Sequence, residues 1–336
     1  MSVSQVETLV IGAGSWGTAL AALLARNGQP TCLWGRDARR MAQIAETRCN
    51  AAYLPDIALP EQLRVSADLA SSLAWAKDVL IVVPSQIFRQ MLRQILPHLN
   101  ASARVAWATK GFESDSGALL HAVACEELGH QRPMAVLSGP TFAVEVAKGL
   151  PTALTVAAND EAFANELAAR LHNDVFRAYT SSDIAGVEVG GAVKNVLAIA
   201  AGVSDGLGYG ANARAALVTR GLTEVMRLGV ALGGQRETFM GLAGLGDLVL
   251  TCTDNQSRNR RFGLALGQGE PLDTARSAIG QVVEGIHAAA EVKRLADGLG
   301  IEMPISEQVY HIVHGGRAPR EAVSLLLHRE QKPEHF

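Results

Sequence analysis

LVIGAGSWGTAL occupies residues 9–20 and places a G-x-G-x-x-G turn between an apolar run and a stretch of small, helix-forming residues. Each glycine has a separate task in such a turn. Gly12 allows the tight bend, Gly14 lets a pyrophosphate approach the backbone, and Gly17 lets the helix lie close to the strand. The first turn of that helix offers unpaired N–H groups and the positive end of its dipole to phosphate groups. The stretch therefore predicts a strand, a turn and a helix that together bind a dinucleotide.

Composition narrows the class of protein. A length of 336 residues predicts about two domains, and 48% hydrophobic with 19% charged residues is typical of a globular chain with ample core. A net charge of −3 argues against a general nucleic-acid or membrane-surface partner. No apolar run of about 18 residues is found, so we expect no membrane span, and the N-terminus enters a strand without a signal peptide.

The cysteines indicate a reducing compartment. They show neither C-x-x-C spacing nor nearby histidines, so we expect free thiols, no metal site and a cytoplasmic location. The four are Cys32, Cys49, Cys125 and Cys252.

The rest of the chain changes character once. Short apolar runs rich in β-branched residues predict strands at 31–34, 78–83, 104–109, 134–137 and 152–157, with helices at 38–47 and 86–96. Strands that alternate with helices indicate right-handed crossovers and a parallel sheet that binds ligands beyond its carboxyl ends. After the N-cap chemistry of residues 181–183 the apolar spacing becomes helical. The sequence predicts an α/β fold, with a Rossmann-type doubly wound parallel sheet in residues 1–182 and an all-helical domain in residues 183–336.

Arg36 and Asp37 follow the second expected strand, where dinucleotide sites bind the ribose. An acidic residue there suits the 2′-hydroxyl of NAD, and an arginine suits the 2′-phosphate of NADP. We favour Arg36 as an NADPH contact because it follows the strand more closely. A solvated surface arginine is the alternative.

Two lysines and one acid are candidates for chemistry. Lys194 lies in an apolar, small-residue helix, where a buried charge is costly without a partner and where burial suits a lysine to proton donation. A lysine that extends from the helix to solvent is the alternative. Lys110 ends a strand on the expected ligand side, where it can polarise a carbonyl, hold a phosphate or serve only solubility. Asp247 ends a glycine-rich bend and can orient Lys194 or cap a helix.

The stretch Ser257-Arg258-Asn259-Arg260-Arg261 combines a hydroxyl, an amide and three guanidinium groups at an expected helix start. Arginine matches phosphate oxygens bidentately, and helix N-termini favour anions. The stretch predicts a phosphate site, with a solvated basic turn as the alternative.

Six motifs follow one another along the chain: Gly12-Ala13-Gly14-Ser15-Trp16-Gly17-Thr18, Lys110-Gly111, Ser138-Gly139-Pro140-Thr141-Phe142-Ala143, Lys194-Asn195, Gly244-Leu245-Gly246-Asp247 and Ser257-Arg258-Asn259. Together and in this order they closely resemble the bacterial NAD(P)-dependent glycerol-3-phosphate dehydrogenases, from Gly12 to about Val283-Glu284. The block at residues 138–143 and Lys194-Asn195 are more specific than the glycine turn.

The resemblance implies a role for each matching residue. Lys194 would be the general acid, Lys110 would contact substrate and nicotinamide, and Asp247 would bind substrate and couple to Lys194. Substrate would be bound by Lys110, Gly139, Thr141, Lys194, Asp247, Ser257, Arg258 and Asn259. Cofactor would be bound by Gly12, Gly14, Ser15, Trp16, Gly17, Arg36, Lys110, Ala143, Arg258, Val282 and Glu284.

The implied reaction is the reduction of dihydroxyacetone phosphate to sn-glycerol 3-phosphate by NADPH or NADH, with NADPH favoured and no metal. Its product would supply glycerophospholipid synthesis. The resemblance also allows a homodimer, although the sequence does not reveal the oligomeric state. A related two-domain reductase acting on another substrate, such as 6-phosphogluconate, and a nucleotide sensor without turnover are the alternatives.

Overall fold

The computed structural model describes residues 7–114 and 116–330. The chain divides into two compact units, residues 1–188 and 189–336. The division lies inside helix α8 (Ile184–Gly206), whose N-terminal turn follows the boundary expected from the sequence at residues 182 and 183.

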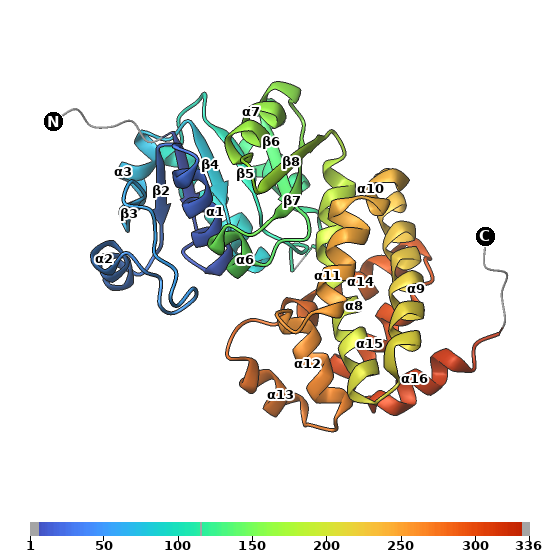
Figure 1. Ribbon diagram of the computed structural model, residues 1–336. Helices are drawn as coiled ribbons and strands as arrows, with labels where there is room; N and C mark the ends of the chain where they lie inside the picture. Colours follow the sequence, from blue (N-terminus) through green and yellow to red (C-terminus); the bar gives the residue numbers. More distant parts are fainter. Residues whose placement is uncertain (1–6, 115, 331–336) are drawn as a thin grey trace. The chain divides into compact units, whose positions relative to one another are not determined.

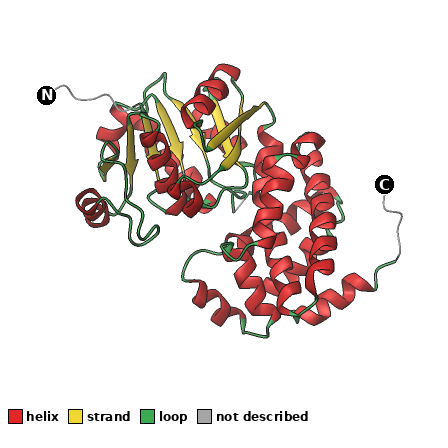
Figure 2. Cartoon of the chain, viewed as in Figure 1, coloured by secondary structure: helices red, strands yellow, loops and turns green. Residues whose placement is uncertain are grey.

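The first unit is built on one eight-stranded sheet in the order β3-β2-β1-β4-β5-β6-β7-β8 (Figures 1 and 2). Neighbouring strands are parallel except β6 and β7, which are antiparallel. The strands are β1 (Thr8–Ile11), β2 (Thr31–Trp34), β3 (Arg64–Ser66), β4 (Asp78–Ile81), β5 (Arg104–Trp107), β6 (Met134–Ser138), β7 (Thr152–Ala158) and β8 (Phe176–Ser181).

Helices cover both faces of this sheet, as in a Rossmann-type fold. One group packs together on the face shown in front in Figure 1: α1 (Ser15–Arg26), α6 (Ala143–Lys148) and α7 (Glu161–Leu171). A second group consists of α3 (Leu69–Ala74), α4 (Phe88–Ile95) and α5 (Leu120–Leu128), with short 3-10 turns η1 (Ser85–Ile87) and η2 (Leu96–His98) flanking α4. Helix α2 (Ala38–Thr47) packs beside β3.

The sequence analysis missed β3 and β8 and was wrong about the direction of β7. Both missed strands are edges of the sheet, and their side chains are mostly exposed or half-buried, so they carry no apolar run. Strand β7 runs back along β6 because the short helix α6 between them packs against α1 and does not form a full crossover. The sheet is therefore mixed: β3 to β6 form one parallel set, and β7 and β8 form a second parallel pair that runs in the opposite direction.

Helices are the only regular secondary structure in the described residues of the second unit, 189–330. It contains most of α8 together with α9 (Gly210–Ala231), α10 (Arg236–Met240), the π-helical turn η3 (Leu242–Gly246), α11 (Asp247–Thr253), α12 (Arg258–Gly267), α13 (Leu272–Ile279), α14 (Glu284–Leu299), α15 (Pro304–Gly315) and α16 (Pro319–Leu327).

Helix α8 is the core helix. It is long and apolar enough to cross a membrane by length and composition, but 89% of its most apolar window is buried inside the protein. Burial of this kind is what the central helix of a bundle requires. The apolar character of α8 therefore reflects packing.

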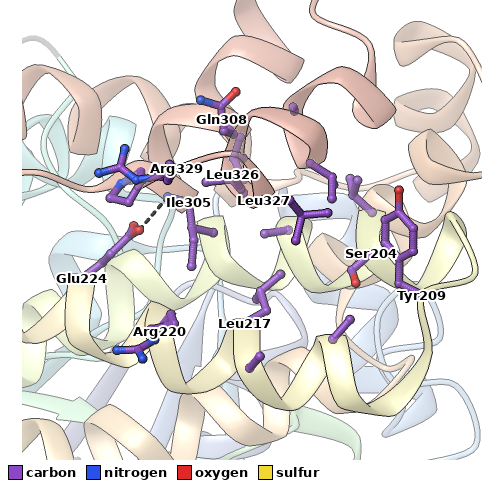
Figure 3. Close-up of a pocket in the computed structure, with 18 of the residues that line it drawn as sticks. Ser204, Tyr209, Leu217, Arg220, Glu224, Ile305, Gln308, Leu326, Leu327 and Arg329 are labelled. Atoms are coloured by element: carbon purple, nitrogen blue, oxygen red, sulfur yellow. Dashed lines mark hydrogen bonds between the residues drawn. The ribbon is translucent and has the colours of Figure 1, made fainter. Parts of the chain in front are cut away.

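A groove of about 720 Å³ lies in the second unit among α8, α9, α15 and α16 (Figure 3). Its lining is mostly aliphatic, with Leu217 and Leu326 near its middle and Tyr209 and Arg329 toward opposite ends. Buried Glu224 caps α15 there by accepting hydrogen bonds from the backbone N–H groups of Ile305 (2.6 Å) and Ser306 (3.0 Å). None of the site residues expected from the sequence lines this groove.

Candidate functional site

The glycine-rich turn connects β1 directly to α1. Gly12 has a φ of 120°, and a Cβ added there would lie 2.2 Å from the carbonyl oxygen of Val82. A Cβ on Gly17 would lie 1.9 Å from the carbonyl oxygen of Gly12, so this glycine permits the close packing of helix and turn. Gly14 differs, because a Cβ there would meet no atom within 4 Å. The turn is tight on its protein side and open at Gly14.

The features around this turn fit a pyrophosphate. Helix α1 begins at Ser15, and its N-cap, Gly14, provides no side-chain hydrogen bond to the first turn. The N–H groups of a first helical turn lack partners within the helix and favour anions. The indole nitrogen of Trp16 is buried without a hydrogen-bond partner among the described residues. A bound pyrophosphate would supply acceptors to the backbone N–H groups of the first turn, whereas the buried Trp16 nitrogen is not accessible to a ligand.

The two residues after β2 have different surroundings. Asp37 is the N-cap of α2, and its carboxylate accepts a hydrogen bond from the backbone N–H of Arg40 at 3.0 Å. The side chain of Arg36 is exposed. The structure thus gives Asp37 a role in starting the helix, and Arg36 remains the predicted 2′-phosphate contact.

Lys110 lies beyond the carboxyl end of β5, next to the residues that follow β6. Its ammonium group is 3.5 Å from the carbonyl oxygen of Gly139, and the hydroxyl of Thr141 donates to that same oxygen at 3.2 Å. Ala143 is the first residue of α6. Four predicted site residues therefore lie close together at the carboxyl edge of the sheet, where parallel α/β sheets bind ligands.

Lys194 is buried in the second unit, with 7% of its surface exposed, so it does not extend to solvent. Its ammonium group donates to the carboxylate of Asp247, which is 1% exposed, and to the hydroxyl of Thr251 at 3.1 Å. Asp247 is the first residue of α11, and Gly246 occupies the N-cap position. The acid is thus an ion-pair partner of Lys194.

A glycine in α8 lets the bend that carries Asp247 come close. A Cβ on Gly190 would lie 2.4 Å from the carbonyl oxygen of Ala243, and Gly244 is also in contact. Gly190 weakens the helix by propensity but has a packing function, since η3 lies directly against the helix that bears Lys194.

A hydrogen-bonded chain of amides continues from Lys194. The amide of its neighbour Asn195 donates to the carboxylate of Glu284 at 3.2 Å and accepts from the amide of Asn259 at 2.9 Å. The Asn259 amide oxygen in turn accepts from the backbone N–H of Gly285 at 2.9 Å. The sequence analysis placed three of these residues at the site, and the structure brings them together within the second unit.

The arginines at the start of α12 have unequal roles. Ser257 is the N-cap and accepts from the backbone N–H of Arg260 at 3.2 Å. The guanidinium of Arg260 is buried against Asp205 at 2.5 Å and donates to the carbonyl of Cys252 at 3.0 Å, so it stabilises the fold. Arg258 is half-buried and contacts Gln281 at 3.1 Å. The expectation of three guanidinium groups facing a phosphate is wrong for Arg260.

Val282 is 49% exposed and lies just before α14, which begins at Glu284. Within residues 7–114 and 116–330, no cluster of three or more His, Cys, Asp or Glu side chains could hold a metal ion.

The sequence analysis missed Thr251. A threonine in an apolar helix is unremarkable by composition, but it lies four residues after Asp247, on the same helix face. That spacing is the signal that could have found it. Asn195 was part of a matching motif, but no role was assigned to its amide.

Two models of one protein family match most of the chain. Residues 7–164 match the family model for the N-terminus of NAD-dependent glycerol-3-phosphate dehydrogenase, and residues 183–324 match that for its C-terminus. A glycerol-3-phosphate dehydrogenase (NAD(P)+) from Nitrosococcus oceani is 58% identical over 331 residues, covering 98% of this chain and 96% of that protein. One of the same name from Klebsiella pneumoniae is 56% identical over 335 residues, covering 99% of each.

Among solved structures, the glycerol-3-phosphate dehydrogenase of Coxiella burnetii has a TM-score of 0.93 and 51% sequence identity, covering 96% of this chain and 99% of that one. The likeness thus extends over nearly the whole length of both chains. This chain therefore belongs to the NAD-dependent glycerol-3-phosphate dehydrogenase family and is an NAD(P)-dependent oxidoreductase.

Proposed function

We propose that this protein reduces dihydroxyacetone phosphate to sn-glycerol 3-phosphate with NADPH or NADH, and catalyses the reverse reaction. The observation that carries the proposal is the buried Lys194, held by Asp247 and Thr251 in the helical unit. A proton donor of this kind is what carbonyl reduction requires and what a nucleotide sensor does not need.

The cofactor supplies a hydride to C2 of the substrate when its reduced nicotinamide is bound. The residues that would hold it begin with the glycine-rich turn, which the open face of Gly14 and the uncapped start of α1 favour. Arg36 would bind the 2′-phosphate of NADPH. Further contacts would come from Ser15, Trp16, Lys110, Ala143, Arg258, Val282 and Glu284.

The substrate would be held by predicted residues at the start of α12 and by predicted residues that follow β5 and β6. Arg258 and Asn259, at the N-terminus of α12, would bind the phosphate, because Arg258 does not share the internal ion pair of Arg260. Lys110 and Thr141 would contact the rest of the substrate, as would Gly139 and Ser257.

Lys194 would donate its proton to the carbonyl oxygen of C2 as that oxygen becomes an alkoxide. One proton would thus pass from the ammonium group to oxygen and one hydride from the reduced nicotinamide to carbon, so C2 would carry an uncharged hydroxyl and the charge of the phosphate would not change. Asp247 and Thr251 would orient the ammonium group before transfer. The neutral amine left behind would regain a proton from water, and in the reverse direction it would act as the base.

One assay decides between this function and its alternatives. Purified protein should oxidise NADPH when dihydroxyacetone phosphate is added, and should reduce NADP+ with sn-glycerol 3-phosphate but not with 6-phosphogluconate. Turnover with 6-phosphogluconate alone would favour the related reductase. Binding of NADPH without any turnover would favour the sensor.

The cellular setting is part of the same proposal. All four cysteines are free thiols, which suits the cytoplasm. There the product would feed glycerophospholipid synthesis. We propose that the protein assembles as a homodimer. We expect it to have no nucleic-acid partner and no membrane span.

A further inference from the structure

Residues 48–60 form a segment beside the glycine-rich turn that is anchored by several contacts. The guanidinium of Arg48 donates to the carbonyls of Pro60 and Leu63, the latter at 2.8 Å, and so closes the segment at its base. Cys49 and Ala58 pair as an isolated β-bridge. The segment also contributes Leu54 to the core that α1 shares, where Leu54 is 1% exposed. Hydrogen bonds near its ends and the buried Leu54 in its middle therefore anchor the segment.

Asn50 of this segment is 1% exposed and reaches the turn. Its amide nitrogen donates to the carbonyl oxygen of Ala13 at 3.1 Å and to the hydroxyl of Thr18 at 2.8 Å. Ala13 lies between the first two glycines of the turn, and Thr18 lies in the first turns of α1. One side chain thus joins the turn to the helix that follows it.

The other peptides of the turn are fixed by the backbone. The N–H of Gly12 donates to the carbonyl of Trp34 at 2.9 Å, and the carbonyl of Gly14 accepts from the N–H of Thr18 at 3.0 Å. The carbonyl of Ala13 is held by Asn50. In a planar trans peptide the C=O of one residue and the N–H of the next point in opposite directions. By holding the Ala13 carbonyl, Asn50 therefore aims the Gly14 N–H away from itself.

The chemistry of the side chain matches this task. Two acceptors at short range require two N–H donors on a short, uncharged side chain, and asparagine supplies them. Its amide oxygen is buried and has no hydrogen-bond partner among the described residues. Such an orphaned acceptor opposes folding and calls for an explanation beyond the filling of space.

We propose that Asn50 is a positioning residue for the cofactor, because it fixes the Ala13–Gly14 peptide so that the Gly14 N–H is oriented for the pyrophosphate before binding. The inference rests on the proposed placement of the dinucleotide on this turn. Since NADPH and NADH share the pyrophosphate, Asn50 should affect the binding of both equally.

The test compares Asn50→Ala with Asn27→Ala. Asn27 is the C-cap of the same helix, α1, and its amide donates to the carbonyls of Arg170 (2.8 Å) and Leu171 (3.0 Å), so the control removes similar bonds at the opposite end. Fluorescence titration gives Kd for each coenzyme, and thermal unfolding gives Tm. We expect Asn50→Ala to raise both Kd values about tenfold, the fold-change of one net hydrogen bond, with kcat at saturating coenzyme unchanged. Asn27→Ala should lower Tm but leave both Kd values as they are.

Two further variants keep the test decisive. Asn50→Asp keeps the shape but donates no hydrogen bond, so it should weaken coenzyme binding at least as much as Asn50→Ala. Thr18→Val removes one of the two bonds without altering residues 48–60, and it should weaken binding of both coenzymes by a smaller factor. Thr18→Val therefore also tests the inference if Asn50→Ala does not fold.

Unchanged Kd values in folded Asn50→Ala, or equal weakening by Asn27→Ala, would overturn the inference, as would loss of NADPH binding alone. These titrations need no turnover. If the unmodified protein binds NADPH but does not reduce dihydroxyacetone phosphate, the proposed reaction is refuted. The comparison of Kd values would still test the role of Asn50.

Discussion

Replacing Lys194 by methionine separates the chemistry of this side chain from its packing. Methionine has a similar length and retains the apolar contacts of the stem, but it cannot donate a proton. Lys194 is 7% exposed and Asp247 is 1% exposed, so the substitution changes a largely buried ion pair. The expected results are a large loss of turnover and a separate loss of stability.

The two losses have different magnitudes and causes. General acid catalysis contributes about 10²–10⁴-fold to rate, so kcat should fall by at least about 10²-fold. Removal of one member of a buried ion pair leaves the other charge without compensation, at a cost of about 3–5 kcal/mol in the free energy of unfolding. Thr251 stays in contact with Asp247 through its hydroxyl, which donates to the Asp247 carbonyl at 2.6 Å, so part of the local structure should persist.

A double variant distinguishes these effects. Lys194→Met/Asp247→Leu removes both charges and should recover much of the lost stability, because an apolar pair can replace a buried ion pair. It should not recover turnover. Lys293→Met is the matched control, since Lys293 pairs with Asp297 at 2.6 Å near the surface of the same unit. It should change neither quantity appreciably.

Urea unfolding, NADPH titration and steady-state kinetics on the same preparations provide the measurements. A folded Lys194→Met protein that binds NADPH and keeps most of its kcat would refute the assignment of Lys194 as proton donor. Lys110 would then be the next candidate.

Three further predictions concern recognition and pH. Arg36→Ala should raise KM for NADPH far more than KM for NADH, since a charge-assisted hydrogen bond contributes about 1.5–3 kcal/mol; equal effects on both coenzymes would contradict this and direct attention to Asp37. Arg258→Ala should lower kcat/KM for dihydroxyacetone phosphate by the equivalent of about 2–5 kcal/mol, and the same loss with unphosphorylated dihydroxyacetone would show that the arginine is structural. Burial raises the pKa of Glu224 to about 7 from an ordinary value of 4.5. Between pH 4.5 and pH 7 the Glu224 carboxyl is therefore protonated in the folded protein and ionised in the unfolded chain, so the free energy of unfolding should fall by about 1.4 kcal/mol for each unit that the pH rises. Glu224→Gln should remove this pH dependence in urea unfolding, and an unchanged dependence would show that Glu224 does not titrate in this range.

Short sequence patterns correctly predicted the elements whose formation depends on neighbouring residues in the chain. The turn at residues 12–17 follows from steric demands on three glycines, and its neighbouring strand and helix form where the sequence indicates them. The edge strands β3 and β8 could not be predicted in this way, because most of their residues are exposed or half-buried and form no apolar run. The antiparallel direction of β7 depends on how α6 packs against α1, which is a tertiary contact.

The same distinction applies to the arginines of α12. Arg258 and Arg260 are equivalent by composition and lie two residues apart. On a helix that spacing places them on different faces, and only the fold reveals that the face of Arg260 meets Asp205 at 2.5 Å. Sequence analysis could predict a basic helix start there, but it could not decide which of the two guanidinium groups forms an ion pair inside the protein.

Helix α8 shows why a buried charge is a useful but incomplete guide to chemistry. Its three charged residues are Glu188, Lys194 and Asp205, and each has partners in the structure. Glu188 accepts from the indole of Trp107 at 2.9 Å and pairs with His121 at 2.7 Å.

Asp205 is bracketed by Arg214 at 2.7 Å and by Arg260. All three charges would have attracted attention by their cost in an apolar helix. What distinguishes Lys194 is the kind of partner it has: a carboxylate and a hydroxyl that orient an ammonium group, followed along the chain by an amide, Asn195, bonded to two more predicted site residues. The burial of a charge therefore identifies where to look in α8, and the chemistry of the partners is the reason that we propose Lys194 as the residue of the three that donates a proton.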